Sequence, residues 1–231
     1  MAERAPLIPG PGAAITTWVE SVPGEAGIGP AEVHVWRFPL GHPGSSNVAS
    51  QSALREVLSG YTRTVPREVE IVRAPRGKPM LAPPSAEVHF NVSHSGNWGL
   101  IAVALFAVGV DVEQVRPKRA APALANRFLT QGERELLKQR EATSGETAFF
   151  MIWTRKEAYL KAVGFGLSGP FSHVDSSGSR LPDLDEHGHQ LAGDTPWAVE
   201  EFFVDDRHPA TVVTRAKQLA LRSFTLRRSD V

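Results

Sequence analysis

Alternating apolar and polar positions predict a run of strands in the first half of the chain. The segment Val33-His34-Val35-Trp36-Arg37-Phe38 alternates in the manner of a half-buried strand. A loop rich in Gly, Pro and Ser follows it, and the next segment predicts a helix over residues 48–61. Further strands are predicted at 69–73, 88–92, 98–105 and 107–112.

The second half of the chain has a different pattern. Helical spacing predicts helices at 121–128, 131–140 and 147–162, and strands at 171–174, 197–203, 210–214 and 223–227. Strands around one long helix in each half favour an α+β fold with two similar lobes, 31–115 and 116–231, and a cleft between them. Residues 1–30, rich in Pro, Gly and Ala, predict a flexible N-terminal arm.

Composition then narrows the function classes. The 231 residues carry 25 basic and 25 acidic side chains, so no overall charge favours nucleic acid or a membrane surface. The absence of cysteine excludes disulfides, zinc thiolates and thiol nucleophiles, which fits a reducing compartment. With neither a signal peptide nor a membrane span in the pattern, we expect a cytoplasmic protein.

Two acidic positions share one face of the strand predicted at 107–112 and its end. Side chains alternate in a strand, so Asp111 and Glu113 lie together while the valines between and before them face a core. In the helix predicted at 147–162, Glu157 and Lys161 stand at i and i+4, with Trp153 one turn earlier. Three carboxylates beside lysine suit Mg²⁺ bound to a diphosphate. The simpler alternatives are a solvated acid pair and a helix-stabilising ion pair.

Two further motifs are typical of anion binding. The segment from Phe90 to Gly96 predicts a strand that leads into a turn, with Ser93 and His94 near its end. Neighbouring strand residues point apart and no G-x-S-x-G motif is present, so phosphate binding is favoured over a hydrolase. Arg76-Gly77-Lys78-Pro79 places two cations around a flexible and a rigid residue, either as an anion site or as an exposed turn.

Basic residues also cluster before and within the helix predicted at 121–128. Arg116, Lys118, Arg119 and Arg127 precede Phe128 and Leu129. The cluster predicts either a rim that binds an acidic partner or an ordinary solvated stretch.

Four blocks agree in order and spacing with one protein family. They are Gly77-Lys78-Pro79, Phe90 to Ser95, Gly109 to Glu113, and Trp153 to Ala162 with Gly164 and Gly166-Leu167. On these blocks, which span about residues 70–172, the chain resembles the 4′-phosphopantetheinyl transferases of the type that modifies acyl and peptidyl carrier proteins of secondary metabolism. The resemblance implies a pseudo-twofold monomer with coenzyme A in the cleft between two α+β lobes.

The resemblance also implies a reaction and a role for each motif. A serine of an apo carrier protein attacks the β-phosphate of coenzyme A, takes the phosphopantetheine arm and releases adenosine 3′,5′-bisphosphate, as in holo-[acyl-carrier-protein] synthases. Asp111, Glu113 and Glu157 would hold Mg²⁺, or Mn²⁺, on the diphosphate. Glu157, directly or through a metal-bound water, would be the general base. The remaining contacts to coenzyme A would come from Lys161, Lys78, Ser93 and His94, with Arg76, Gly77 and Pro79 in the same loop as Lys78.

One region departs from the family pattern. Relatives often carry a basic helix that helps to hold the nucleotide, whereas residues Leu40 to Leu54 contain no Lys or Arg, and Arg55 is the first cation. The hypothesis that follows is a different grip through Arg73 or Arg76. Two alternatives to the transferase remain: a non-catalytic protein that binds coenzyme A or docks carriers, and another Mg²⁺-dependent transferase of nucleotide diphosphates.

Overall fold

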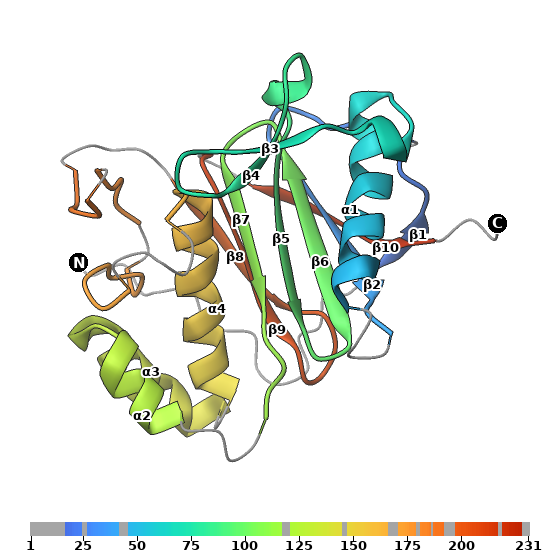
Figure 1. Ribbon diagram of the computed structural model, residues 1–231. Helices are drawn as coiled ribbons and strands as arrows, with labels where there is room; N and C mark the ends of the chain where they lie inside the picture. The colour runs from blue at the N-terminus through green and yellow to red at the C-terminus, as the bar shows by residue number, and fades with distance from the viewer. Residues whose placement is uncertain are drawn as a thin grey trace.

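The computed structural model describes residues 17–24, 27–41, 46–116, 121–144, 147–165, 171–178, 181–185, 187–191, 197–216 and 219–227 (Figure 1). Its strands are β1 (Val19–Ser21), β2 (Glu32–Pro39), β3 (Ile71–Arg73), β4 (Pro79–Leu81), β5 (His89–Ser95), β6 (Trp98–Ala104), β7 (Val108–Val112), β8 (Ala198–Phe203), β9 (Pro209–Thr214) and β10 (Ala220–Leu226). The α-helices are α1 (Ser46–Thr62), α2 (Ala121–Phe128), α3 (Gln131–Ser144) and α4 (Thr147–Ala162). No helix in this described part of the chain combines the length and apolarity needed to cross a bilayer.

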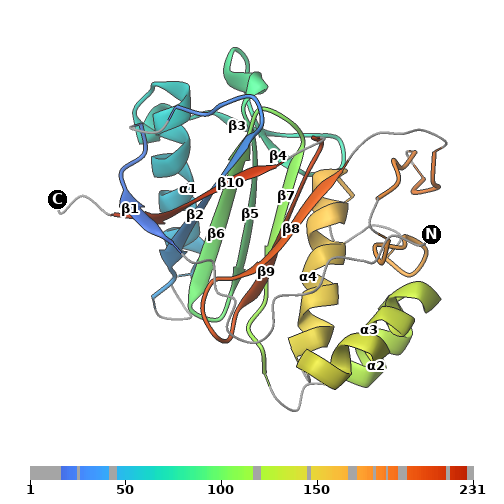
Figure 2. The same ribbon diagram turned by 180° about the vertical axis from the view of Figure 1, so that it is seen from behind.

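Two sheets form the centre of the molecule. One has the strand order β1-β10-β2-β6-β5, in which β10 pairs in parallel with both β1 and β2, and the pairs β2/β6 and β6/β5 are antiparallel. The other has the antiparallel order β7-β9-β8, and β3 and β4 form a separate hairpin. Strand β10 lies beside β2 in this sheet (Figure 2), so the end of the chain completes the sheet that the first strands begin.

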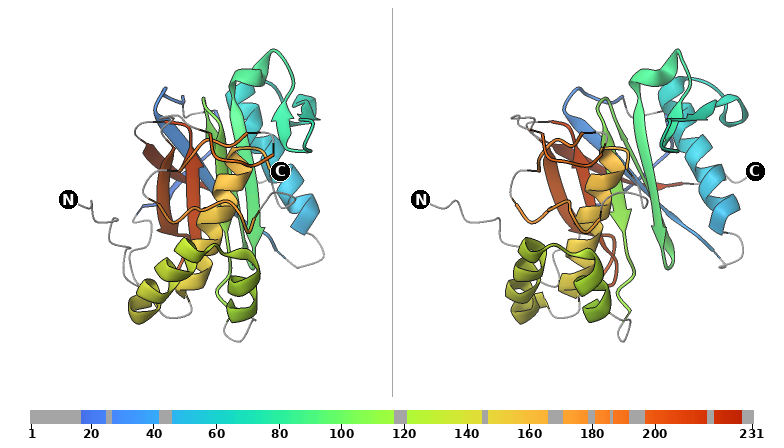
Figure 3. Two further views of the ribbon diagram at one scale, coloured as in Figure 1. Left: turned by 90° about the vertical axis from the view of Figure 1, so that its left-hand side faces the viewer. Right: turned by 60° about the vertical axis from the view of Figure 1, so that its left-hand side comes forward.

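Strand alternation divides the core into layers. Trp36 and Phe38 of β2 pack beneath α1, whereas Val33 and Val35 of the same strand face the second sheet. The second sheet buries Val108, Val110 and Val112 against the first and packs its other face on α4. Helices α1 and α4 therefore cover different sides of the paired sheets (Figure 3).

Most predicted elements agree with the structure, and the α+β class is confirmed. The strand expected at 171–174 is wrong: these residues form a turn and an irregular segment. Buried side chains satisfy the backbone there, since the Lys156 ammonium donates to Val174 O at 2.7 Å and the Ser176 N–H donates to Glu133 Oε1 at 2.9 Å. A segment bonded in this way needs no strand partner.

The sheets do not divide the chain at residue 115. Strand β7 lies before that point and pairs with β9, whereas β10 lies after it and pairs with β2. The part of the expected N-terminal arm that the structure describes includes β1, and Trp18 packs edge-on against Phe202. The rest of that arm, residues 1–16 and 25–26, lies outside the described residues. The pseudo-twofold relation of two lobes stays a prediction.

Candidate active site

Asp111 of β7 and Glu113, directly after the strand, face helix α4. Gly109, Asp111 and Glu113 share the strand face opposite the buried valines, and a Cβ atom on Gly109 would lie 2.0 Å from the carbonyl oxygen of Ala158. Only glycine allows the helix to approach the strand this closely. The close packing places Asp111, which is 2 % exposed, beside the last turns of α4.

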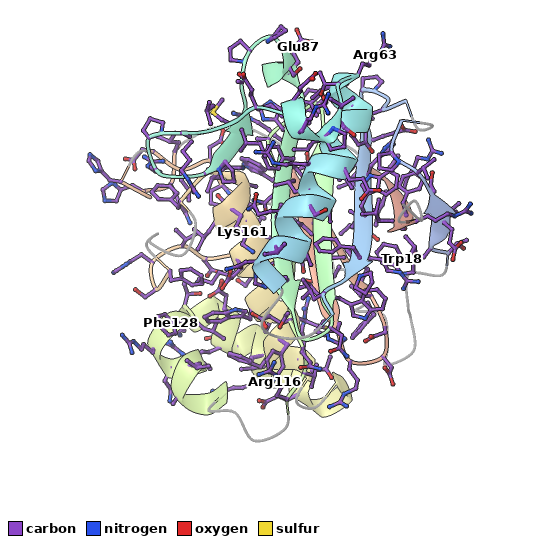
Figure 4. All side chains as sticks on the ribbon, turned by 45° about the vertical axis from the view of Figure 1, so that its right-hand side comes forward. Trp18, Arg63, Glu87, Arg116, Phe128 and Lys161 are labelled. Atoms are coloured by element: carbon purple, nitrogen blue, oxygen red, sulfur yellow. The ribbon has the colours of Figure 1, made fainter. Side chains whose placement is uncertain are left out.

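Lys161 is the centre of the charged cluster. Its Nζ donates to Asp111 Oδ1 at 2.6 Å, to Ser93 Oγ at 3.1 Å and to Val110 O at 3.3 Å, and it lies 3.8 Å from Glu157 Oε2. The labelled Lys161 in Figure 4 points from α4 toward the strands. Four of the residues predicted for the site, Ser93, Asp111, Glu157 and Lys161, are therefore in contact or within one ion-pair distance.

Strand β5 is joined to β7 by side chains instead of a backbone ladder. Asn91 Oδ1 accepts the Val110 N–H at 2.9 Å, Ser93 Oγ accepts the Val112 N–H at 3.4 Å, and Ser95 Oγ accepts the Gln114 N–H at 3.0 Å. The same serines donate outward, Ser93 Oγ to Asp111 Oδ1 at 2.6 Å and Ser95 Oγ to Glu113 Oε2 at 2.8 Å. The row of polar side chains on β5 therefore orients the carboxylates of Asp111 and Glu113.

Asn91 and Ser95 were missing from the predicted site. The signal that identifies them is the period-two spacing of small hydrogen-bonding residues, 91, 93 and 95, on one face of a strand. The same alternation turns His94 to the other face of β5, where it is exposed. The structure therefore does not bring His94 together with Ser93.

Burial and mutual repulsion dominate the electrostatics of the cluster. Burial, and then the charge of Asp111, raise the pKa of Glu157 to about 8, against the lowering effect of Lys161 and of a Trp153 hydrogen bond. The same two causes raise the pKa of Glu113. Burial by itself lowers the pKa of Lys161, but Asp111 and Glu157 outweigh it and raise that pKa above its ordinary value.

The residues present fit a magnesium ion by donor type. They supply carboxylate oxygens, and Asp111 Oδ2 is buried without a hydrogen-bond partner among the described residues. Asp111 thus has a buried oxygen without a partner, and it lies beside two carboxylates whose pKa values are raised. A hard cation bound there would stabilise the charged form of all three groups. Within the same described ranges, no three His, Asp or Glu side chains are already close enough together to hold a metal ion.

The loop before β4 lies across the end of α4. Lys78 Nζ donates to three backbone carbonyls, those of Val108, Lys161 and Ala162, at 3.0, 2.6 and 3.1 Å. The Arg76 guanidinium lies 4.3 Å from the ring centroid of Phe165. Gly77 has a φ of +83°, and Pro79 opens β4. The predicted contact of these residues with coenzyme A stays a prediction.

Two basic residues of α4 do not line the site. The Arg155 Nε donates to Ser176 O at 2.6 Å, and the Lys156 ammonium pairs with Glu133 at 2.6 Å with both side chains 0 % exposed. The interpretation of the 155–157 triplet as a cleft wall is therefore wrong for Arg155 and Lys156, and for Glu157 it stays a prediction. Four other residues of the predicted motifs, Lys118, Arg119, Gly166 and Leu167, lie outside the described residues.

Comparisons with known proteins decide the family. The model of the 4'-phosphopantetheinyl transferase superfamily matches residues 107–213, and that of the 4'-phosphopantetheinyl transferase N-terminal region matches residues 31–105. The 4'-phosphopantetheinyl transferase HetI of Nostoc sp. is 35% identical over 167 residues, which cover 59% of this chain and 70% of HetI. The chain belongs to the 4′-phosphopantetheinyl transferase superfamily.

Two other relatives match over a smaller share of their own length. A putative 4'-phosphopantetheinyl transferase of Synechocystis sp., slr0495, is 33% identical over 64% of this chain and 63% of its own length. The 4'-phosphopantetheinyl transferase Sfp of Bacillus subtilis is 30% identical over 55% of this chain and 54% of its own. The matches thus span about half to seven tenths of these relatives. A solved holo-(acyl-carrier-protein) synthase from Bacillus anthracis, in complex with CoA (3',5'-ADP), aligns with 47% of this chain and 93% of its own at 19% identity and a TM-score of 0.34, too low to support an argument.

Proposed function

We propose that the chain transfers the 4′-phosphopantetheine arm of coenzyme A to a serine of an apo acyl or peptidyl carrier protein. The observation that carries the proposal is the contact of Lys161 with Asp111, Ser93 and Glu157 at the junction of β5, β7 and α4. These residues belong to three of the four blocks that the superfamily shares. The superfamily to which the chain belongs supplies the reaction class.

In the proposed reaction the carrier serine oxygen forms a bond to the β-phosphorus of coenzyme A. The phosphoanhydride bond to the α-phosphate oxygen breaks, and adenosine 3′,5′-bisphosphate leaves. Glu157, whose carboxylate lies 3.8 Å from the Lys161 ammonium, accepts the serine proton. The Lys161 ammonium, fixed by Asp111 and Ser93, offsets the charge that develops on the leaving oxygen.

Asp111, Glu113 and Glu157 would hold Mg²⁺, or Mn²⁺, in the proposed site. Such an ion, when bound, supplies a positive charge that neutralises the diphosphate. The chain's own contribution is orientation, since Ser93 donates to the carboxylate of Asp111 and Ser95 to that of Glu113.

The basic residues that bind the nucleotide end of coenzyme A would have to lie outside α1. Arg55 of α1 is engaged locally, because its guanidinium donates to Val69 O at 2.6 Å. Arg73 and Arg76 lie in the β3–β4 hairpin and are more exposed than Arg55, although the Arg73 guanidinium donates to Gly77 O at 2.9 Å. We therefore assign the nucleotide grip to these two arginines. Alanine variants of both should weaken coenzyme A binding in a titration, and unchanged affinity in each would exclude this grip.

A carrier protein would meet the molecule at the basic end of α2. Arg127 is exposed and lies 5.0 Å from the ring of Phe128, which packs against Trp153. In the view of Figure 4, Arg116 and Phe128 both lie below Lys161. Leu129, once expected in this rim, is buried and unavailable to a partner.

Intact mass spectrometry tests the proposed function. An apo carrier protein incubated with this chain, coenzyme A and Mg²⁺ should gain the mass of one phosphopantetheine arm. The gain should disappear with Glu157→Gln and Lys161→Met. A panel of fatty acid, polyketide and peptide carriers with no gain would instead favour a non-catalytic protein or a different diphosphate transferase.

A further inference from the structure

Lys78 joins the two elements that carry the charged cluster. One of its three acceptors, Val108 O, lies at the start of β7, and the other two, Lys161 O and Ala162 O, lie at the end of α4. An ammonium has three N–H donors, and each has a carbonyl acceptor here. The side chain that makes these bonds comes from neither element, since Lys78 directly precedes β4.

Two of the three bonds fall at the C-terminal end of α4. The last carbonyls of a helix lack partners within the helix, and the negative end of its dipole favours a cation. One acceptor is the carbonyl of Lys161, the residue whose ammonium contacts Asp111. The other end of the bridge, Val108, is three residues before Asp111 on the same strand.

At the interface that Lys78 bridges, the backbones of β7 and α4 are in direct contact. Gly109 packs directly against the backbone of Ala158 and Ala162, so no side chain of Gly109 fixes the distance between strand and helix. The same loop makes a second contact just beyond α4, where the Arg76 guanidinium stacks on Phe165. Burial lowers the pKa of Lys78 to about 8, in keeping with an ammonium withdrawn from solvent.

We infer that Lys78 is a positioning residue: it fixes Lys161 relative to Asp111 by bridging the backbones of α4 and β7, and it does not bind a phosphate of coenzyme A. The inference rests on the proposed function for its kinetic consequence. It assigns Lys78 a different role from the phosphate contact that the family resemblance implies.

The test compares Lys78→Met with the wild type on coenzyme A and on dephospho-coenzyme A, which lacks the 3′-phosphate. A positioning role predicts that kcat falls roughly tenfold or more while KM for coenzyme A changes little. The preference for coenzyme A over dephospho-coenzyme A should stay as in the wild type. A direct phosphate contact predicts the reverse, a raised KM and a lost preference, and that result would overturn the inference.

Two controls separate positioning from general destabilisation. Arg76→Ala, placed in the proposed nucleotide grip, is the variant in which the preference should fall. Val57→Ala removes buried volume beneath α1, away from the bridge, and should lower stability while leaving kcat per folded molecule unchanged. If Val57→Ala lost kcat per folded molecule as much as Lys78→Met, the role of Lys78 would be merely structural.

Hydrogen exchange gives a readout that needs no activity. Lys78→Met should speed amide exchange in residues 158–165 and 108–112, whereas Val57→Ala should speed it in α1. If the wild type modified no carrier, the proposed function would fail, and exchange would still decide whether the bridge exists. Unchanged exchange at both segments in Lys78→Met would refute the bridge.

Discussion

The ammonium of Lys161 and the carboxylate of Asp111 are 2.6 Å apart, and the two side chains are 18 % and 3 % exposed. One oxygen of Asp111 is thereby satisfied by Lys161 and Ser93, whereas the other has no partner within the described residues. A buried carboxylate of this kind depends on its cation, because desolvation would otherwise disfavour its charge.

Lys161→Met should therefore impair both activity and stability. We expect transfer to the carrier to fall by about 100-fold or more, since the group that offsets leaving-group charge is lost. Unfolding free energy should fall by about 3 kcal/mol, as when one partner of a buried pair is removed. Lys138→Met on the exposed side of α3 is the matched control and should leave both quantities unchanged. Urea denaturation and single-turnover kinetics measure the two effects.

Glu157 makes stability depend on pH. Its pKa is about 8 in the folded chain against an ordinary value of 4.5, so between these two pH values the folded state holds a proton that the unfolded state releases. Stability should fall as pH rises from about 5 to 8, and the raised pKa of Glu113 acts in the same direction. The pKa of Lys161 is raised from an already high value, so its contribution changes only at higher pH.

Glu157→Gln should flatten this dependence of stability on pH. Compared with the wild type, the variant should gain stability at pH 8 relative to pH 5. Thermal melts of both proteins across that range, without divalent ions, measure the difference. Parallel curves for the two proteins would contradict the assignment of the raised pKa to Glu157. Addition of Mg²⁺ should raise the melting temperature of the wild type at pH 8 more than that of the variant.

Asn91 tests the bonds between β5 and β7. Asn91→Ala leaves the buried Val110 N–H without its acceptor, which should cost about 1–3 kcal/mol of unfolding free energy. Asn97→Ala removes the same side chain from an exposed position at the turn between β5 and β6 and should be near neutral. Equal losses in the two variants would show that the β5 side chain does not support β7.

Sequence periodicity predicted the pairs of site residues that are close to each other along the chain. Alternation placed Asp111 and Glu113 on one strand face, and the i, i+4 spacing placed Glu157 near Lys161, because both rules describe backbone geometry over a few residues. That Asp111 meets Lys161 requires the packing of β7 on α4, which the Gly109 contact makes possible. Periodicity carries no information on such a contact. The prediction that these residues share one site came from the family resemblance.

Contacts between distant segments account for the errors. Lys156 looked like part of a cleft wall, but its partner is Glu133, 23 residues earlier, and the pair is fully buried. For Lys78 the sequence left an anion site and an exposed turn open, and it gave no sign of the carbonyls that Lys78 bonds, which lie 30, 83 and 84 residues away. The charge of a residue is visible in the sequence, whereas the acceptor that it meets is set by the packing of the whole chain.

Arg127 tests the proposed contact with the carrier protein. It is exposed at the end of α2 and its guanidinium lies over Phe128, so a reversed charge there should repel an acidic carrier without disturbing the core. Arg127→Glu should raise KM for the carrier by roughly tenfold at low salt and by less at high salt, where screening weakens both attraction and repulsion. The affinity for coenzyme A should not change.

Arg134→Glu is unsuitable as a control, because Arg134 donates to Leu129 O at 2.5 Å and supports the turn between α2 and α3. Arg63→Glu is better: the residue is exposed and, in Figure 4, lies at the opposite end of the molecule from Phe128. Its KM for the carrier should equal that of the wild type. If Arg127→Glu behaved like Arg63→Glu at low salt, the carrier would dock elsewhere, because an acidic partner seated on α2 must respond to the sign of this charge.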